Sequence, residues 1–265
     1  MSRIQRLIKR LAGRSFDYQG LRKATSIDQS VAWNRQRPIE MFNGNVLRAK
    51  VVQGIIEAVP CNNLYETGTY HGATAIGAQR YLRLPVWSCE VNPRNYLISR
   101  IVTFNMPNIF IFRDDSRNFL HRVCSHLQTV PEARPFFYLD AHENELDTNS
   151  LPLKEEIQII FSLNEFVVMI DDFRIPLMDS FEARMYAGVV IEIKLIKDIL
   201  THSRIKTCYF PAYHSSQDTG YPSGYCVFWR SEKLDSLMKS SLFPLNLLRP
   251  YAITEEVYLE NNTGL

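Results

Sequence analysis

Three aspartates and a histidine stand in two short segments of the sequence: Asp140 and His142 are two positions apart, and Asp171 and Asp172 are adjacent. Each segment directly follows an apolar run that is typical of a buried strand. If the two strands are neighbours in a parallel sheet, the three carboxylates meet at one edge of it. Carboxylates held close together repel one another, so either a carboxyl pKa rises or a cation lies between them. Oxygen ligands of this kind suit Mg²⁺, Mn²⁺ or Ca²⁺.

His142 offers a second kind of chemistry. The pKa of an ordinary histidine lies near neutrality, so its imidazole can take a proton from a hydroxyl group of a bound molecule. The side chain could instead line a pocket or bind a water molecule. The adjacent aspartates also have a plainer interpretation, in which Asp171 caps a strand and Asp172 begins a loop, with no metal bound.

A loop from Glu66 to Gly72, with the sequence ETGTYHG, contains two glycines, at positions 68 and 72. Such glycines allow a tight turn from a strand into a helix and let a ligand approach the backbone closely. The dinucleotide-binding pattern is G-x-G-x-x-G, which places a pyrophosphate at the helix N-terminus. Here Glu66 replaces the first glycine. Its carboxylate would repel a pyrophosphate but would attract an ammonium or sulfonium group, so the loop disfavours a nicotinamide dinucleotide.

The elements that position these residues follow from alternating apolar runs and amphipathic stretches. Strands are predicted at 64–66, 86–90, 109–112, 136–139 and 166–170, and helices at about 73–84, 94–105, 118–127 and 153–163. A helix at 189–200 and a hairpin of strands at 205–210 and 225–229 complete the pattern. This order predicts an α/β fold with a Rossmann-like, seven-stranded, mainly parallel sheet flanked by helices. Polar residues end each of the first five strands, which predicts a ligand site at that edge of the sheet.

Together these motifs resemble the class I S-adenosylmethionine-dependent methyltransferases, whose first strand ends in an acid followed by G-x-x-x-G. The resemblance covers roughly residues 62–174 and implies S-adenosylmethionine as the cofactor. The cofactor-binding residues that it implies are Glu66, Gly68, Thr69, Gly72, Glu90, Asp114, Asp115, Ser116 and Asp140. Glu90 would accept hydrogen bonds from both ribose hydroxyls. One of the three residues at 114–116 would contact the adenine, and the choice among them is open.

Within that family, the two aspartate segments look like those of the metal-dependent sugar O-methyltransferases of the macrocin type. This implies that Asp140, Asp171 and Asp172 bind a divalent ion such as Mg²⁺, which would lower the pKa of the acceptor hydroxyl. Asp140 and His142 are the implied catalytic residues. The acidic stretch at 143–150 has no counterpart in the sugar enzymes, so the acceptor is predicted only as a small hydroxylated molecule, with a sugar or glycan precursor as one candidate.

Composition limits the other classes of function. The chain has 265 residues, 46% of them apolar, which suits one α/β domain, and a formal charge of only +2 gives no field that attracts nucleic acid. Five cysteines without a C-x-x-C pair predict reduced thiols in a cytoplasmic protein. No apolar run approaches the roughly 20 residues of a transmembrane helix.

Residues 1–50 are predicted to form an N-terminal helical extension to a domain at 51–265. Ile4, Leu7, Ile8 and Leu11 share one face of a basic amphipathic helix. That face could pack against the domain or a second subunit, as in a homo-oligomer, or it could make weak contact with a membrane surface.

The sequence thus favours an S-adenosylmethionine-dependent O-methyltransferase. A non-catalytic binding or regulatory protein of the same fold is the alternative, and gathered repelling aspartates argue against it. A nicotinamide-dependent oxidoreductase is disfavoured by Glu66, and an RNA methyltransferase by the near-neutral charge. The loop at 213–224 could supply acceptor contacts through Tyr213, His214 and Tyr221, with Tyr225 just beyond it, or these rings could pack on one another. Arg174 could contact an anionic substrate or form a surface ion pair.

Overall fold

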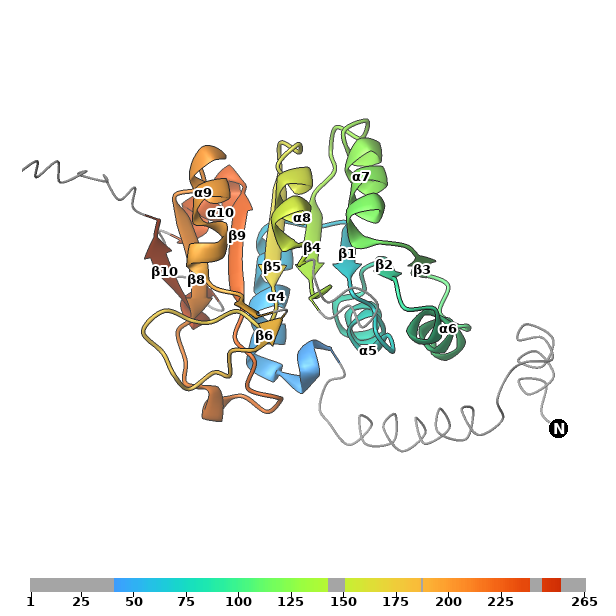
Figure 1. Cartoon of the computed structure of the whole chain (residues 1–265). Coiled ribbons are helices and arrows are strands. Elements are labelled where there is room, and N and C mark those ends of the chain that lie inside the picture. Colours follow the sequence, from blue (N-terminus) through green and yellow to red (C-terminus); the bar gives the residue numbers. More distant parts are fainter. Residues whose placement is uncertain (1–40, 143–150, 187, 239–244, 254–265) are drawn as a thin grey trace, which may run out of the picture.

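The structure is a computed structural model, and it describes residues 41–142, 151–186, 188–238 and 245–253. Within these residues, an eight-stranded sheet runs through the molecule in the order β10-β8-β9-β5-β4-β1-β2-β3 (Figure 1). Five neighbouring strands are parallel. They are β1 (Asn63–Thr67), β2 (Val86–Glu90), β3 (Ile109–Arg113), β4 (Pro135–Leu139) and β5 (Phe166–Ile170). Their carboxyl ends therefore lie at the same edge of the sheet.

Three further strands extend the sheet beyond β5. They are β9 (Cys226–Arg230), β8 (Thr207–Pro211) and β10 (Leu248–Ala252). Strand β9 is antiparallel to both β5 and β8, and β10 is antiparallel to β8. A separate two-stranded sheet is formed by β6 (Met185–Tyr186) and β7 (Val189–Val190).

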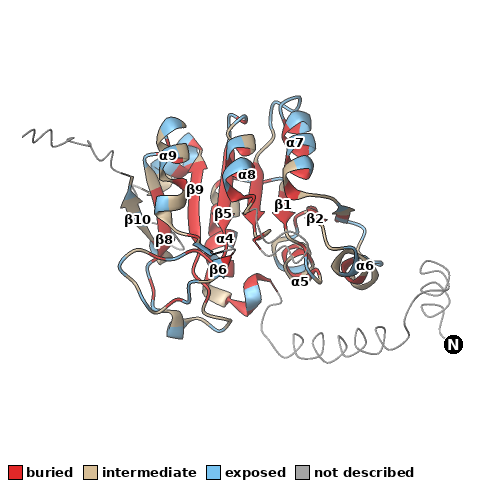
Figure 2. Ribbon diagram, in the orientation of Figure 1, coloured by how far each residue is buried: buried red, intermediate tan, exposed pale blue. Residues whose placement is uncertain are grey.

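Helices cover both faces of the sheet. Helices α7 (Ser116–Leu127), α8 (Leu153–Ile160) and α9 (Ile193–His202) lie in a row on one face, and α4 (Val46–Ala58) lies on the other (Figure 1). The remaining helices are α5 (Ala73–Gly77), α6 (Pro93–Val102), α10 (Glu232–Met238), the π-helical turn η3 (Ala78–Leu82) and the 3₁₀ turns η2 (Phe42–Gly44), η4 (Ser215–Gln217) and η5 (Leu245–Leu247). This double cover explains why β4 and β5 are buried along their whole length (Figure 2).

Local sequence signals set the points at which the chain turns away from β2 and β3. The Asn92 side chain caps α6 by accepting from the backbone amide of Arg94 at 2.9 Å, and Pro93 occupies the first helical position. The Asp115 side chain caps α7 in the same way, accepting from the amide of Arg117 at 2.9 Å. Both helices therefore begin within three residues of their strands, which keeps the strand ends open to a ligand.

The Rossmann-like, mainly parallel sheet is confirmed, with eight strands in place of the predicted seven. The additional strand β10 carries Arg249 and Pro250, and so lacks the apolar pattern of a buried strand. Proline is tolerated there because β10 is an edge strand, where an amide donor can be dispensed with.

The helix predicted at 189–200 begins later than expected, at Ile193. Val189 and Val190 pair instead with β6 in a short antiparallel ladder. Gly188 has a φ of +78°, which permits the tight reversal that this ladder requires. The sequence predicts Val189 and Val190 as part of the helix because these two apolar residues directly precede its amphipathic pattern.

Residue 50, the predicted end of the N-terminal extension, lies inside α4. This helix packs on the core through Val51, Val52 and Ile55. Residues 1–40, with the predicted amphipathic face, and the acidic stretch at 143–150 lie outside the described residues, so the extension, oligomerisation and membrane contact stay predictions. Among the described helices, none has the length and apolar character needed to cross a bilayer. The five cysteines are buried and unpaired.

Candidate functional site

A cavity of about 570 Å³ opens at the carboxyl ends of β1 to β5. The predicted site residues that line it are Glu66, Gly68, Thr69, Glu90, Asp114, Asp115, Ser116, Asp140, His142 and Asp172. Two predicted residues, Gly72 and Asp171, do not line it. The cavity therefore lies at the edge of the sheet where the sequence predicts a ligand site.

The glycine loop is shaped by a close crossing of two chain segments. Gly68 has a φ of +83°, and a Cβ atom at this position would lie 2.3 Å from the carbonyl oxygen of Asp140. Its amide donates to the carbonyl of Cys89 at 3.0 Å. Gly72 also has a φ of +83° and is the N-cap of α5. Gly68 is thus required by both space and conformation, and Gly72 by conformation.

Glu66 is a buried acid in the cavity wall. It is 1% exposed and accepts a hydrogen bond from the Ser88 hydroxyl at 2.5 Å. Burial raises the pKa of Glu66 to about 8, against an ordinary value of 4.5. A bound ammonium group would stabilise the charged form of this carboxyl, so the side chain suits a cationic amino-acid group.

Glu90 is held by two backbone amides. One carboxylate oxygen accepts from the amide of Tyr70 and the other from that of Asn92, each at 2.8 Å. Because both oxygens are fixed at the end of β2, the carboxylate has a set orientation along the cavity. Each oxygen has a second lone pair with which it can accept from a ligand hydroxyl.

The three residues after β3 have different environments. Asp115 caps α7, and its carboxylate also accepts from the Arg117 guanidinium at 2.9 Å through each oxygen. This hydrogen bonding by Arg117 lowers the pKa of Asp115. Asp114 forms an ion pair with Arg122, and Ser116 is buried at the first position of α7. Asp115 is therefore committed to the helix start, whereas Asp114 accepts from one backbone amide, that of Asp115 at 2.9 Å, and pairs with the exposed Arg122.

Asp140 and His142 follow β4 and line the cavity together. Burial and the neighbouring carboxylates of Asp171 and Asp172 raise the pKa of Asp140. His142 is 5% exposed, and neither of its ring nitrogens has a hydrogen-bond partner of normal geometry among the described residues. Burial lowers its pKa to about 4, so the imidazole is neutral near pH 7. A neutral, unpartnered imidazole in a cavity wall is available to a ligand.

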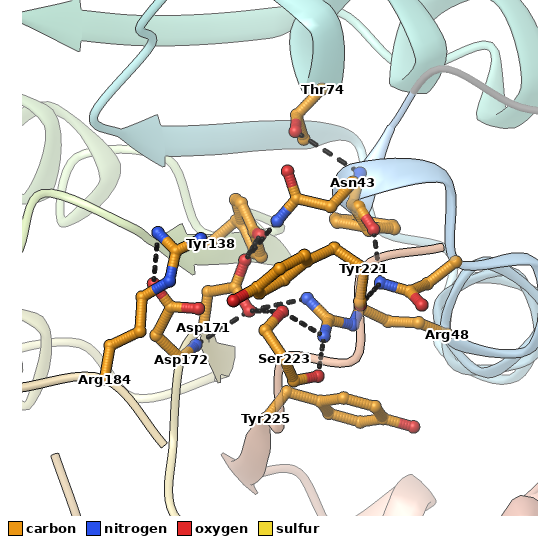
Figure 3. Close-up of polar contacts among 12 residues, drawn as sticks. Asn43, Arg48, Thr74, Tyr138, Asp171, Asp172, Arg184, Tyr221, Ser223 and Tyr225 are labelled. Atoms are coloured by element: carbon orange, nitrogen blue, oxygen red, sulfur yellow. Dashed lines mark hydrogen bonds and ion pairs between the residues drawn. The ribbon is translucent and has the colours of Figure 1, made fainter. Parts of the chain in front are cut away.

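Asp171 faces away from the cavity and is fully buried. Its carboxylate forms an ion pair with Arg48 at 2.6 Å and accepts from the Tyr138 hydroxyl at 2.5 Å and the Ser223 hydroxyl at 3.1 Å (Figure 3). Burial alone would raise the pKa of Asp171, but Arg48 and Tyr138 outweigh it and lower the pKa. The charge of Asp171 is thus neutralised inside the protein.

Asp172 lies on the cavity wall with a backbone φ of +52°. It accepts a hydrogen bond from the Tyr186 hydroxyl and forms an ion pair with Arg184 at 3.7 Å. Burial and the adjacent charge of Asp171 raise its pKa to about 6. The two adjacent aspartates therefore point to different surroundings, one to the core and one to the cavity.

The predicted metal site of Asp140, Asp171 and Asp172 is not supported. Among the described residues there is no group of three or more histidines, cysteines or acids arranged to hold a metal ion. The physical reason is that protein donors already saturate Asp171, and a guanidinium supplies the positive charge that a metal would bring.

Several cavity residues were not predicted from the sequence. Asn43, Arg184 and Tyr186 line the cavity together, and the Arg184 guanidinium lies over the ring of Tyr221 at 4.8 Å. Their positions depend on segments far apart in the chain, and no local motif marks them. Arg48, which contacts Asp171 across 123 positions, has no sequence signal either.

Of the aromatic residues expected near the acceptor, Tyr221 alone lines the cavity. Tyr213 and Tyr225 are buried, and their hydroxyls lie 3.3 Å apart, so they pack on one another. His214 caps η4 by accepting from the amide of Ser216. Arg174 forms an exposed ion pair with Glu192 at 3.2 Å, the second of its two predicted roles.

Comparisons with known proteins add a limited result. Neither a protein-family model nor a curated protein matches the chain. Similar solved structures include an O-methyltransferase from Bacillus cereus in complex with SAH, at 14% identity over 81% of this chain and 92% of that one, with a TM-score of 0.46.

Two further solved structures give similar values. The methyltransferase domain of bacterial CtHen1-CN is 10% identical over 69% of this chain and 97% of that one, with a TM-score of 0.45. A putative O-methyltransferase from Nostoc punctiforme is 11% identical over 69% of this chain and 55% of that one, with a TM-score of 0.44. Likeness at this level assigns no function, which must come from the residues of the cavity.

Proposed function

We propose that this chain is an S-adenosylmethionine-dependent O-methyltransferase that acts on a small hydroxylated acceptor. The observation that carries the proposal is that Glu66 and Glu90, at the ends of adjacent strands, line one cavity with the close-approach glycine Gly68. A cofactor with an ammonium group at one end and a ribose in the middle requires one carboxylate for the ammonium group and another for the ribose hydroxyls. A pyrophosphate would instead meet the carboxylate of Glu66.

Different residues of the cavity would bind different parts of the cofactor. Glu66 would accept from the ammonium group, and Glu90 would accept from the two ribose hydroxyls. Asp114 would accept from the amino group of the adenine, because Asp115 is committed to the start of α7. When bound, the cofactor supplies a methyl group on a sulfonium, which is already an activated electrophile.

Asp140 and His142 would act on the acceptor. Asp140 is a better proton acceptor than an ordinary carboxylate because its pKa is raised, so it would take the proton from the acceptor hydroxyl. The neutral imidazole of His142 would hydrogen-bond the acceptor and hold the hydroxyl oxygen in line with the methyl group. Proton removal and alignment are the two contributions that methyl transfer to oxygen requires of the protein.

The acceptor side of the cavity suits a molecule rich in hydroxyl groups. It presents an amide from Asn43, phenols from Tyr186 and Tyr221, the carboxylate of Asp172 and the guanidinium of Arg184. Alternating donors and acceptors beside aromatic rings are the groups that bind a sugar or a similar polyol. A sugar or glycan precursor is therefore the acceptor class that we propose.

Incubation with methyl-labelled S-adenosylmethionine and a panel of sugars and sugar nucleotides tests this function. We expect labelled product with the wild type and a loss of at least about 100-fold in turnover with Asp140→Asn. The exposed acid Asp179 supplies the matched control, Asp179→Asn, which should keep full turnover. Transfer that survives unchanged in Asp140→Asn would contradict the assignment of the proton acceptor.

A further inference from the structure

Arg48 is a cation enclosed in the protein core. It lies near the start of α4, is 1% exposed, and has its guanidinium over the ring of Tyr225 at 4.8 Å. One guanidinium nitrogen donates to Asp171 at 2.6 Å, and the other donates to the Ser223 hydroxyl at 2.9 Å and to its carbonyl at 2.5 Å (Figure 3). A buried guanidinium persists only where such partners compensate for its lost hydration.

The partner carboxylate has no open position. Besides Arg48, Asp171 accepts from the hydroxyls of Tyr138 and Ser223 and from the backbone amide of Asp172 at 2.7 Å. The side-chain amide of Asn43 also donates to it, at 3.5 Å, so five donors share the two oxygens of one carboxylate, which can accept about four hydrogen bonds. A metal ion would have to displace the guanidinium and a hydroxyl to reach it.

The donors around Asp171 come from four separate segments of the chain. Asn43 belongs to η2, Arg48 to α4, Tyr138 to β4 and Ser223 to the loop before β9. The backbone amides of Leu47 and Arg48 also donate to Asp218, at 2.9 and 3.3 Å, which fixes the same loop on α4. The arrangement therefore joins α4, β4 and the loop before β9 around one buried carboxylate.

We propose that the Arg48 guanidinium takes the place of a divalent metal ion as the counterion of Asp171, so that this carboxyl edge works without a bound metal. The inference rests on the proposed function in one respect: both concern the cavity at the carboxyl ends of β1 to β5. Its consequence is that Asp140 and Asp172 line the cavity with no metal ion between them, and Asp172 is paired with Arg184 instead. Proton removal from the acceptor then depends on a protein base.

The metal arm of the test uses the intact wild-type chain with saturating S-adenosylhomocysteine and Mn²⁺ as the probe. Electron paramagnetic resonance of free Mn²⁺ should show no binding up to millimolar ion. One bound Mn²⁺ with a Kd below about 100 µM, lost in Asp171→Asn, would overturn the proposal, because oxygen-rich sites of this kind bind Mn²⁺. S-adenosylhomocysteine binding is measured separately on the same sample, so failure of the proposed function is distinguishable from failure of the inference.

The counterion arm is a double-mutant cycle followed by thermal unfolding. Arg48→Met leaves a buried carboxylate without its counterion, so the unfolding midpoint should fall by about 10 °C. The double variant Arg48→Met with Asp171→Asn should fall by less than the sum of the two single variants. Additive losses would show that Arg48 and Asp171 do not neutralise each other and would overturn the proposal. If Arg48→Met does not fold, Arg48→Gln, which also removes the charge but keeps a hydrogen-bond donor, replaces it in the cycle.

Discussion

The carbonyl oxygen of Asp140 lies 2.3 Å from the position that a Cβ atom on Gly68 would occupy. The turn after β1 and the turn after β4 therefore cross closely, and the glycine loop meets the segment of Asp140 and His142 there. This crossing in the cavity wall has no room for a side chain at position 68.

Gly68→Ala should disrupt both turns at this crossing. The substitution adds the clash with Asp140 to the strain of a positive φ, so we expect a loss of stability of about 3 kcal/mol or more and at least about a tenfold loss of S-adenosylhomocysteine affinity. Gly188→Ala is the matched control, since Gly188 has a φ of +78° but no atom within 4 Å of the added Cβ. It should cost only about 1 kcal/mol. Equal losses in chemical denaturation would show that the crossing is unimportant.

Glu66 should make stability depend on pH. Its pKa in the folded protein, about 8, is above the ordinary 4.5, so between these values the folded protein holds a proton that the unfolded chain has lost. The free energy of unfolding should therefore fall as pH rises through this window, by about 1–4 kcal/mol, relative to Glu66→Gln. Urea unfolding of both proteins from pH 5 to pH 9 measures the difference. A difference that is constant across this range would contradict the raised pKa.

Asp114 and Asp115 should have separable roles. Asp115→Ala removes the α7 cap and should cost about 1 kcal/mol of stability while changing S-adenosylhomocysteine affinity less than about threefold. Asp114→Asn should weaken the affinity more than it weakens stability, because the Arg122 partner of its ion pair is largely exposed. Calorimetry and thermal unfolding of both variants decide the point. The reverse pattern would assign the adenine contact to Asp115.

We expect the His142 side chain to contribute to methyl transfer and not to the stability of the fold. Among the described residues, its two buried ring nitrogens have no hydrogen-bond partner of normal geometry, so His142→Phe should leave the free energy of unfolding unchanged or raise it by about 1 kcal/mol. The same variant should lose methyl transfer to the acceptor. In contrast, His214→Phe removes a ring nitrogen that caps η4 and should lower stability. A strongly destabilised His142→Phe would indicate a structural role for the imidazole.

The sequence predicted the strands and the edge of the site well because those signals are local. The boundaries of β2 and β5 were predicted to the residue, since each is a mostly apolar run that ends at, or just before, an acidic residue. Glu90 and Asp172 come directly after or at such ends, so their placement on the cavity follows from the strand positions. Strand β10 lacked this signal because Pro250 and Arg249 interrupt it.

The role of Asp171 could not be predicted, because it depends on long-range contacts. Adjacent residues at a strand end point in different directions, and the sequence does not say which of the two aspartates faces the core. Arg48 lies 123 positions before Asp171 in the chain, and only the packing of α4 brings its guanidinium to this carboxylate. Three aspartates and no visible counterion therefore suggested a metal ion, when the counterion was an arginine without a motif.

Calorimetric titration with S-adenosylhomocysteine tests the central claim most directly. The wild type should bind one equivalent, and Glu90→Gln should weaken binding at least about tenfold, because the amide NH₂ that replaces one oxygen cannot accept from a ribose hydroxyl and faces a backbone N–H donor. Glu57→Gln, at an exposed acid on α4, should bind as the wild type does. A folded wild-type protein that binds NAD⁺ but not S-adenosylhomocysteine would contradict the account.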